Sequence, residues 1–238
     1  MPAAKGTGTK TKPKGRKKAA KKSTSRARPS RYLLKEEAEP ITERGRATRR
    51  KILEAAEQCF SEFGYSEASV AEIVRRSGLA QGTFYNYFDS KKEIFTALIR
   101  SIYQGMLDST RSGAERARGE GLDRVEVEVQ ATQSFFDWLA EHRNMHRILN
   151  LMDEVDPELT IEYFSSFARV YAESLSRSMD EEGGLQDVDP EVLAYFLMGG
   201  NEYVSKRWIL WDDAGKMPPR ISRDFARIIA GALRGASS

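Results

Sequence analysis

Basic side chains are the residues of this sequence whose types and spacing point most directly to a chemistry, the binding of phosphate. Residues 1–35 contain thirteen Lys and Arg and no Asp or Glu, so this segment carries a net charge of +13. The chain of 238 residues has a formal net charge of +3, so the remaining residues sum to −10. Clustered cations neutralise polyanions in a salt-dependent, sequence-independent way. The pattern favours a phosphate-binding arm on an acidic body.

The basic segment is unsuited to folding by itself. Residues 1–40 consist mainly of Lys, Ala, Gly, Pro, Ser and Thr, and no Leu, Ile, Val or Phe occurs before Leu33. Such a composition does not bury enough apolar surface to offset the entropy of ordering the backbone. We therefore expect a disordered basic arm over residues 1–40. It would add affinity for DNA, with contact to RNA, contact to an acidic membrane surface, or solubility alone as alternatives.

Targeting and membrane signals are weak in this sequence. No apolar stretch follows the N-terminal charges, so we expect no signal peptide. The longest apolar run lies around Val192 to Val204; it falls short of the ~18 residues that a membrane span needs and is interrupted by Glu202. Cys59 is the single cysteine, which excludes an intrachain disulfide. We expect a cytoplasmic, nucleoid-associated protein without a membrane partner.

Catalytic and metal-binding patterns are also weak. The sequence contains no GxSxG, GxxxxGK[ST] or GxGxxG motif, so we predict neither an enzyme nor a bound cofactor. His142 and His146 have the i, i+4 spacing of a metal-ligand pair, but Asn144 between them makes a continuous helix doubtful and no third ligand is evident. We predict no metal site. Cys59 falls on the apolar face of an expected helix, which indicates inert packing.

The elements that must position any functional residue are helices. From Ile41 onward the apolar residues recur with helical periodicity, and the strand-like run from Val125 to Val129 continues into a helical stripe. We predict an all-α protein. The expected helices are Arg44 to Phe63, Ser69 to Ser77, Gln81 to Tyr87, Ser90 to Thr110, Leu122 to His142, Met145 to Met152, Pro157 to Glu182, Pro190 to Trp211 and Ser222 to Arg234, with a gap at Arg111 to Gly121.

Signals at the helix ends support these boundaries. Gly64 and Gly78 follow the first two helices, and Ser69 and Ser90 begin capping boxes in SVAE and SKKE. Pro157 and Pro190 suit the first turn of a helix, and each follows an Asp able to cap it. Each of these helices is therefore expected to begin or end within a few residues of the position given.

The first three helices have the layout of a helix-turn-helix. A long helix is followed by a short capped helix, a turn containing Gly78, and a second short helix, the one that enters the major groove in such motifs. Gly78 provides the backbone freedom that the turn requires. The residues spaced to form a small core against the first helix are Val70, Ile73, Val74, Leu79, Phe84 and Phe88.

The segment GYSEASVAEIVRRSGLAQGTFYNYFDSKKEIF closely resembles the DNA-binding domain of the TetR (tetracycline-repressor-type) transcriptional regulators. The resemblance runs without gaps from about Arg44 to Leu98, with each short motif in the family's order and spacing. It implies a helix-turn-helix domain at residues 41–89 and a helical ligand-binding and dimerisation domain at residues 90–238. The second domain resembles the family only in its number of helices and total length.

The resemblance implies a set of DNA contacts. The groove-facing residues would be Gln81, Gly82, Thr83 and Tyr85, and the phosphate-holding residues would be Ser69, Tyr87 and Lys91. A Gln side chain pairs with an adenine edge, and a Thr offers a hydroxyl and a methyl group. Phe84 and Phe88 are expected in the core, whereas Tyr85 and Tyr87 are expected on the DNA side rather than in the core.

The start of the first helix carries its own basic cluster. Arg44 and Arg46 lie in RGRATRRK and would reach a flanking minor groove, with a solvated helix start as the alternative. Residues 41–100 have a net charge of +2 and residues 101–238 have −9. This asymmetry favours contact of the first domain with phosphate, and keeps the second domain away from it.

The second domain is dense in aromatic and apolar residues, which suits either a core or a ligand pocket. Asn201 and Glu202 interrupt an apolar helix beside Gly199 and Gly200, so they are candidates to orient the polar end of a ligand. The candidate ligand-binding residues are Phe135, Trp138, Phe164, Phe167, Tyr171, Met198, Asn201 and Glu202. We expect a small apolar effector, either a fatty acyl chain or its CoA thioester, or a bulky aromatic drug or dye.

The last two expected helices, Pro190 to Trp211 and Ser222 to Arg234, each have an apolar face. The residues of these faces are Leu193, Phe196, Leu197, Val204, Trp208, Phe225, Ile228, Ile229 and Leu233. The resemblance implies that these helices form a four-helix bundle with a second subunit. A two-fold dimer reads two half-sites, so we expect a homodimer on a palindromic operator of double-stranded DNA.

These observations favour a ligand-responsive transcriptional repressor. In this hypothesis the effector moves the helix from Ser90 to Thr110 and alters the spacing of the two reading heads, which requires different effector affinities in the two states. The alternative is an architectural DNA-binding protein in which the basic arm dominates. A footprint on one palindromic site would support the repressor, and uniform protection would support the architectural protein.

Overall fold

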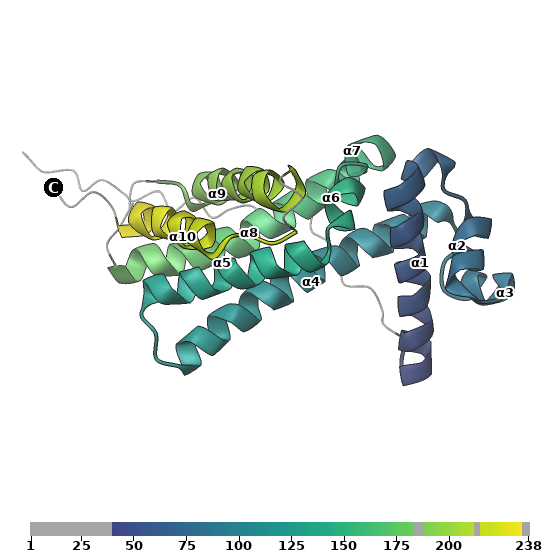
Figure 1. Cartoon of the computed structure of the whole chain (residues 1–238), viewed down its shortest axis with the longest axis horizontal. Coiled ribbons are helices and arrows are strands. Elements are labelled where there is room, and N and C mark those ends of the chain that lie inside the picture. Colours follow the sequence, from purple (N-terminus) through teal and green to yellow (C-terminus); the bar gives the residue numbers. More distant parts are fainter. Residues whose placement is uncertain (1–39, 183–187, 212–214, 235–238) are drawn as a thin grey trace, which may run out of the picture. The chain divides into compact units, whose positions relative to one another are not determined.

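The computed structural model describes residues 40–182, 188–211 and 215–234 (Figure 1). All regular secondary structure in these ranges is helical, which confirms the predicted fold class. The predicted basic arm, residues 1–40, lies outside the described residues except for Pro40.

The first helix, α1, spans Glu43–Glu67 and begins at a side-chain cap. The Gly45 amide donates to the Thr42 hydroxyl oxygen over 3.1 Å, which satisfies one free donor of the first turn. Gly64 has φ +74°, a conformation that favours glycine, and it interrupts the helical backbone where the sequence predicts an end. Three further helical residues follow this break before α2.

The next two helices form the pair predicted from the turn residues. Helix α2 spans Val70–Ser77, and the Ser69 hydroxyl oxygen accepts a hydrogen bond from the Glu72 amide over 3.2 Å. Gly78 then adopts φ +68° and ends α2, and α3 spans Gln81–Tyr85. The predicted helix-turn-helix is therefore present.

A small core joins these three helices. Ile73, Phe84 and Phe88 are almost fully buried, whereas Phe63, predicted on the same apolar stripe as Ile52, is 41% exposed. Phe63 extends beyond the stripe because it directly precedes the break at Gly64, and the Arg76 guanidinium lies 5.0 Å from its ring centre. The first domain therefore folds largely as the spacing predicts.

Helix α4 spans Lys91–Gly119 and corrects one expectation. The predicted gap at Arg111 to Gly121 is helical up to Gly119, because its small residues form a seam against α5, Arg124–Glu141. A Cβ at Gly113 would lie 2.7 Å from the backbone oxygen of Gln130, so only glycine fits there. The Gly, Arg and Glu composition of this segment reflects close helix packing and an exposed outer face rather than a loop.

Capping differs in detail from the prediction. The Ser90 hydroxyl oxygen accepts from the Glu93 amide over 3.1 Å, but the Glu93 carboxylate accepts from the amide of Asp89 over 2.6 Å. A reciprocal capping box forms at the start of α5, between Asp123 and Glu126. The serine halves of both predicted boxes are present.

The remaining helices have the following bounds: α6 Asn144–Leu149, α7 Met152–Val155, α8 Pro157–Glu182, α9 Pro190–Ser205, the π-helix η1 Lys206–Trp211 and α10 Pro219–Arg234. As predicted, Asp156 and Asp189 cap the two helices that begin with proline. The predicted single helix from Met145 to Met152 is two short helices. The predicted helix from Pro190 to Trp211 changes to π-helical winding at Lys206.

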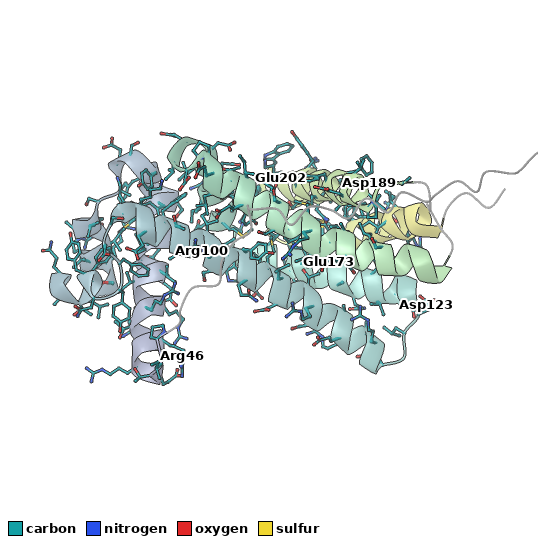
Figure 2. All side chains as sticks on the ribbon, turned by 180° about the vertical axis from the view of Figure 1, so that it is seen from behind. Arg46, Arg100, Asp123, Glu173, Asp189 and Glu202 are labelled. Atoms are coloured by element: carbon teal, nitrogen blue, oxygen red, sulfur yellow. The ribbon has the colours of Figure 1, made fainter. Side chains whose placement is uncertain are left out.

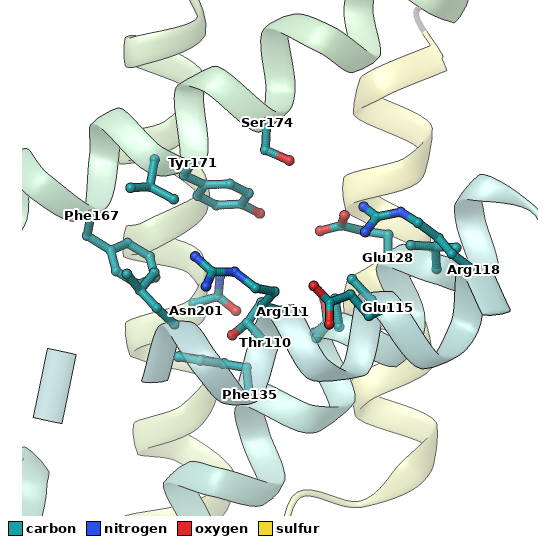
Figure 3. A pocket seen from close by; sticks show the side chains of 16 residues that line it. Thr110, Arg111, Glu115, Arg118, Glu128, Phe135, Phe167, Tyr171, Ser174 and Asn201 are labelled. Carbon is teal, nitrogen blue, oxygen red and sulfur yellow. The ribbon is translucent and has the colours of Figure 1, made fainter. Parts of the chain in front are cut away.

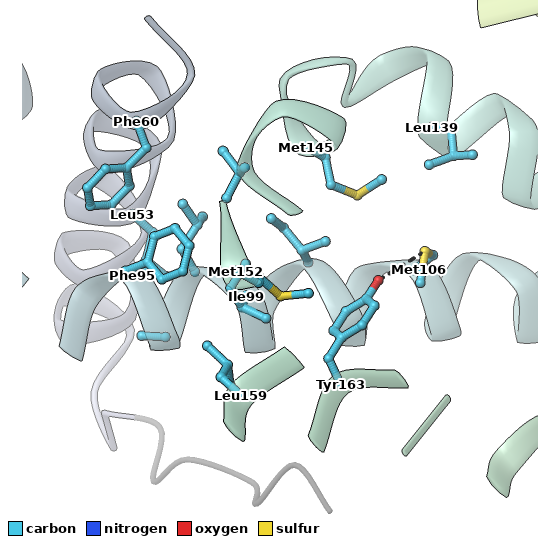
Figure 4. Packing of buried hydrophobic residues seen from close by; sticks show 14 of the residues in the cluster. Leu53, Phe60, Phe95, Ile99, Met106, Leu139, Met145, Met152, Leu159 and Tyr163 are labelled. Atoms are coloured by element: carbon cyan, nitrogen blue, oxygen red, sulfur yellow. Dashed lines mark hydrogen bonds between the residues drawn. The ribbon is translucent and has the colours of Figure 1, made fainter. Parts of the chain in front are cut away.

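Packing of these helices produces one continuous core. Helix α4 packs against α5 and α8, α5 against α10, α8 against α9, and α6 against α1. Figure 4 shows buried side chains from α1, such as Phe60, beside those of α4 and α6, such as Phe95 and Met145. The cluster continues to Tyr163 on α8, whose hydroxyl lies 3.9 Å from the Met106 sulfur. The domain boundary near residue 90 stays a prediction.

Candidate nucleic-acid interface and internal cavity

The outer face of α3 presents the side chains predicted to read DNA. Gln81 and Gly82 are exposed, and Tyr85 is 48% exposed with its ring edge-to-face on the buried Phe84. A Cβ built on Gly82 meets no atom within 4 Å, so the space above the α3 backbone at this position is open. Thr83 is half-buried. The arrangement can bring hydrogen-bonding and apolar groups to base edges.

Two predicted phosphate contacts lie beside this face. Ser69 is exposed; its oxygen accepts from the Glu72 amide, which leaves its O–H able to donate to a phosphate. Tyr87 is half-buried, and its hydroxyl lies 3.7 Å from a Cβ built on Gly45 near the start of α1. Tyr87 therefore combines a core-facing ring with a hydroxyl near the N-terminal end of α1.

Lys91 has a structural role that no sequence feature indicated. Its Nζ donates to the backbone oxygens of Tyr65, Ser66 and Ala68, over 2.8, 3.2 and 2.9 Å, and lies 4.5 Å from the Tyr65 ring centre. The three ammonium protons match these three acceptors. Lys91 thus ties the α1–α2 connection to the start of α4, and a phosphate contact would require it to exchange at least one of these bonds.

The two arginines predicted at a minor groove differ in their surroundings. Arg46, labelled on α1 in Figure 2, donates to the Glu43 carboxylate and to the backbone oxygens of Pro40 and Ile41. Arg44 is exposed at the start of the helix. Arg46 therefore organises the chain entering α1, and Arg44 offers its side chain to solvent.

An ion-pair cluster reduces the positive charge of α2. The Glu72 carboxylate binds Arg75 over 2.6 Å and Arg76 over 2.7 Å, and Arg76 also binds Glu62 over 2.7 Å. Hydrogen bonds from these two arginines lower the pKa of Glu72 to about 2. The arginines of α2 are thus directed to carboxylates of the same domain.

A cavity of about 370 Å³ lies among α4, α5 and α8, with one residue from α9. Figure 3 shows Phe135, Phe167 and Tyr171 on one side of it and Arg118 and Glu128 on the other. Its further lining residues are Leu107, Thr110, Arg111, Ala114, Glu115, Val127, Ala131, Thr132, Val170, Ser174 and Asn201. The lining thus combines aromatic and aliphatic side chains with four charged ones, Arg111, Glu115, Arg118 and Glu128.

Four of the eight predicted ligand-binding residues line this cavity: Phe135, Phe167, Tyr171 and Asn201. Burial raises the pKa of Tyr171, and the nearby negative charge of Glu128 raises it further. The Tyr171 hydroxyl therefore stays protonated and available to donate a hydrogen bond. Helices α5 and α8 thus bring together three of the predicted aromatic residues, Phe135, Phe167 and Tyr171.

The other four predicted residues do not line the cavity. Trp138 packs on Gly105 and stacks on His142 with a ring distance of 4.3 Å. Phe164 is 37% exposed on α8, Met198 packs against the core, and Glu202 forms an ion pair with Lys206. Helical periodicity identifies apolar residues, but does not separate those facing a cavity from those facing a neighbouring helix.

The charged lining residues of the cavity were missed by the sequence-based prediction. Arg111, Glu115 and Arg118 line it from α4 at positions i, i+4 and i+7. Their segment was expected to be a gap between helices. Their helical spacing is a signal that could have identified them.

The outward faces of α9 and α10 carry exposed apolar side chains. They are Val192, Tyr195, Phe196, Tyr203 and Ile228, with Phe196 at 73% exposure. Of the predicted face, Phe196 and Ile228 are among these exposed residues, whereas Leu193, Leu197, Phe225 and Ile229 are buried within the subunit. Cβ atoms built on Gly199 and Gly231 meet nothing within 4 Å. The apolar stripe left for a partner therefore contains part of the predicted face, Phe196 and Ile228, together with Val192, Tyr195 and Tyr203 of α9.

The histidines and the cysteine have structural surroundings. His142 ends α5 and His146 lies on α6, so the i, i+4 pair is not on one helix. Burial lowers the pKa of His146 and raises that of Cys59, which favours the uncharged form of each. Within residues 40–182, 188–211 and 215–234, no three His, Cys, Asp or Glu residues are grouped to hold a metal ion. In the same ranges, no helix has the length and apolar character that crossing a membrane requires.

Comparison with known proteins decides the family. The sequence model described as "Bacterial regulatory proteins, tetR family" matches residues 52–98. The chain is 31% identical over 154 residues to the HTH-type transcriptional repressor Rv1474c of Mycobacterium tuberculosis, covering 63% of this chain and 76% of that protein. The chain belongs to the TetR family. This TetR-family protein is accordingly a transcriptional regulator and not an enzyme, as predicted.

Solved structures show the same fold. The fatty acid degradation regulator FadR from Bacillus halodurans aligns with a TM-score of 0.67 at 22% identity, covering 79% of this chain and 96% of that one. FadR from Bacillus subtilis, solved in complex with stearoyl-CoA, aligns with a TM-score of 0.61 at 18% identity, covering 77% and 98%. The helix arrangement of this TetR-family chain therefore extends beyond the helix-turn-helix.

Proposed function

We propose that this TetR-family protein is a ligand-responsive repressor that binds a palindromic operator as a homodimer. The observation that carries the proposal is the course of α4. Its N-terminal residues Ile94 and Phe95 are buried in the core with Phe60 of α1, whereas Leu107 to Arg118 provide one wall of the cavity. One continuous helix therefore contacts both the DNA-reading part and the cavity, so occupancy of the cavity can bias the position of the reading head.

The DNA-reading part of the proposal rests on α3 and its surroundings. Gln81, Gly82, Thr83 and Tyr85 form the face offered to the major groove, and Ser69 and Tyr87 offer hydroxyls beside it. Arg44 is placed to reach a flanking minor groove. We retain Lys91 as a residue that positions this surface through its backbone contacts.

The homodimer is supported by the stripe on α9 and α10. Exposed apolar side chains gathered on the surface of a protein mark an interaction site. Two open glycines, Gly199 and Gly231, allow partner helices to approach closely. A second copy provides the same self-complementary surface through a two-fold axis.

The cavity supports an effector with an apolar body and a polar end. FadR from Bacillus subtilis binds stearoyl-CoA, so an acyl-CoA-like effector is one candidate. The rings of Phe135, Phe167 and Tyr171 favour the second predicted class, an aromatic drug-like molecule. The charged lining residues of α4, Arg111, Glu115 and Arg118, suit a polar group on the effector in either case.

The test combines operator selection with effector screening. Random double-stranded DNA selected by the full chain should yield one palindrome, and footprinting should protect two half-sites about one helical turn apart. A library of acyl-CoA thioesters and aromatic compounds should then contain members that release this DNA. Uniform protection without a palindrome would instead support an architectural DNA-binding protein. Release by small hydrophilic molecules alone would contradict the proposed effector classes.

A further inference from the structure

Asn201 combines a place in the cavity with an unsatisfied polar atom. It belongs to α9 and lines the cavity with residues of α4, α5 and α8. Its Oδ1 is buried and accepts no hydrogen bond from any residue that the structure describes. By contrast, the Thr110 hydroxyl in the same cavity donates to the Met106 backbone oxygen over 2.9 Å. Asn201 therefore has hydrogen-bonding capacity that the folded chain does not use.

The position of Asn201 makes this capacity costly. Asn201 follows the buried Leu193, Ala194 and Leu197 on α9, and Ser205, a buried polar residue of the same helix, is satisfied by donating to the Glu202 backbone oxygen. A buried carbonyl without a donor destabilises the folded state, whereas an apolar side chain of similar shape does not. An asparagine here is thus unfavourable for the empty protein, which points to a partner that arrives from outside.

The neighbourhood of Asn201 indicates the chemistry of that partner. In Figure 3, Asn201 lies on the side of the cavity that holds Phe135 and Phe167, with Arg111 and Thr110 drawn beside it and Arg118 and Glu128 on the opposite side. Aromatic walls favour a flat, mostly apolar body, and a buried carbonyl favours an N–H or O–H group on its edge. Oδ1 is buried in the structure, so a ligand reaches it only after the Asn201 carboxamide turns about χ2, which exchanges the places of Oδ1 and Nδ2.

We propose that Asn201 is the hydrogen-bond acceptor that positions a flat, mostly apolar effector carrying an N–H or O–H donor on its ring edge. The proposal rests on the proposed function, in which this cavity is the effector site. It also gives the effector a contact with α9, the helix whose outer face holds Phe196 and Tyr203. A ligand bonded to Asn201 therefore contacts both α4 and the helix proposed for dimerisation.

The first test needs no ligand. Replacing Asn201 with Leu removes the unpaired carbonyl and keeps the branching at Cγ, so the thermal midpoint of the full-length protein should rise by about 2–8 °C. Met198→Leu is the control, because Met198 lies on the same helix, packs against the core and does not line the cavity. It should leave the midpoint nearly unchanged. A lower midpoint for N201L would show that Asn201 makes a structural hydrogen bond, and would overturn the proposal.

The second test uses two ring probes of matched shape. Indole carries an N–H where benzofuran carries an oxygen, so the pair isolates one donor. Calorimetry on the full-length protein without DNA should show indole binding about tenfold more tightly than benzofuran, the equivalent of one hydrogen bond. N201L should bind both probes equally. Equal binding by the unaltered protein, a preference that survives in N201L, or no binding of either probe below ~1 mM would each overturn the proposal.

These results are separable from the proposed function. Operator binding and the release of operator DNA by effectors are measured on the unaltered protein, separately from the two probes. The protein could bind operator DNA and release it with an effector, yet bind the two probes equally. That result would contradict the proposed role of Asn201 and support the proposed ligand-responsive repressor. If the protein binds no operator, the proposed function as a repressor is contradicted, regardless of how the two probes bind.

Discussion

The guanidinium of Arg143 donates a hydrogen bond from Nη2 to the backbone oxygen of Ile209 over 2.9 Å. This bond joins the turn between α5 and α6 to the π-helix that continues α9. The residue after Arg143, Asn144, begins α6, and its side chain is hydrogen-bonded to Glu57 of α1. Burial raises the pKa of Glu57, which is consistent with a covered contact. One short turn therefore connects the DNA-reading part to the end of the proposed dimerisation helix.

Replacing Arg143 with Ala should destabilise the protein by about 1.5–3 kcal/mol, the range for a charged hydrogen bond removed from a buried acceptor. Arg143→Lys should recover only part of this, because lysine lacks the planar fork of arginine. Urea unfolding of the two variants measures the difference. Hydrogen exchange should also increase in η1, Lys206–Trp211. An unchanged free energy of unfolding would show that the Arg143 bond contributes nothing.

Lys91→Met should lower stability by about 1.5–3 kcal/mol because three backbone oxygens lose a charged donor. The matched control is Lys92→Met. Lys92 binds Asp156 over 2.9 Å through a side chain that is 58% exposed, so its loss should have a smaller effect. Chemical unfolding gives both values. If Lys91 acts only on phosphate, K91M would weaken DNA binding and leave unfolding unchanged.

Phe196→Glu should dissociate the proposed homodimer. Phe196 is 73% exposed in the subunit, so the change places a charge on the apolar stripe without affecting the core. We expect the dimer dissociation constant to rise by about thirtyfold or more, measured by analytical ultracentrifugation. Ile41→Glu is the control, since Ile41 is a 95% exposed apolar residue near the start of α1. A monomeric unaltered protein at micromolar concentration would refute the dimer.

His146 should make stability depend on pH. Burial lowers its pKa, and Lys206 lowers it further, while Glu202 acts in the opposite direction. The unfolded chain therefore binds a proton at higher pH than the folded protein does, so stability is full above the ordinary value of 6.5 and falls as the pH decreases below it. His146→Gln should flatten the thermal midpoint between about pH 7.5 and 5.5. The same pH dependence in H146Q as in the unaltered chain would count against His146, and H142Q serves as the control.

Deleting residues 1–35 should flatten the dependence of DNA affinity on salt. Removing one phosphate-neutralising cation from the interface reduces the slope of log affinity against log salt by about 0.9. The preference for the selected operator over random DNA should remain, because the arm has no predicted base contacts. Fluorescence anisotropy at several salt concentrations measures both quantities. An unchanged slope would leave the arm without a role in DNA binding.

The helix-turn-helix could be predicted almost residue by residue because its signals are local. Gly78 occupies a left-handed position that few other residues adopt, and Ser69 caps the helix that it precedes. Phe84 and Phe88 repeat at helical spacing and are buried as expected. Each of these features depends on neighbours only a few positions away, so short-range patterns identify it.

The cavity and the outer stripe could be predicted only in part because both depend on distant packing. Helix α9 is apolar on two adjacent faces, and periodicity alone does not show whether Leu193 or Val192 faces outward. Gly113 suggests a loop in the sequence, and its role in helix packing depends on the contact with α5, which the sequence alone does not show. The bonds from Lys91 and Arg143 join positions 23–26 and 66 residues away, respectively, and no spacing rule covers such distances.

The close approach at Gly113 also determines how α4 can move. Because no side chain fits between Gly113 and the backbone oxygen of Gln130, this point of α4 is held against α5. Lys91 lies 22 residues earlier, about 33 Å along a straight helix. If α4 tilts by ~5° about Gly113, its start moves by about 3 Å, while the nearby residues at the cavity wall move by less than about 1 Å. The movement at the start of α4 is close to the ~3.4 Å rise of one base pair along DNA.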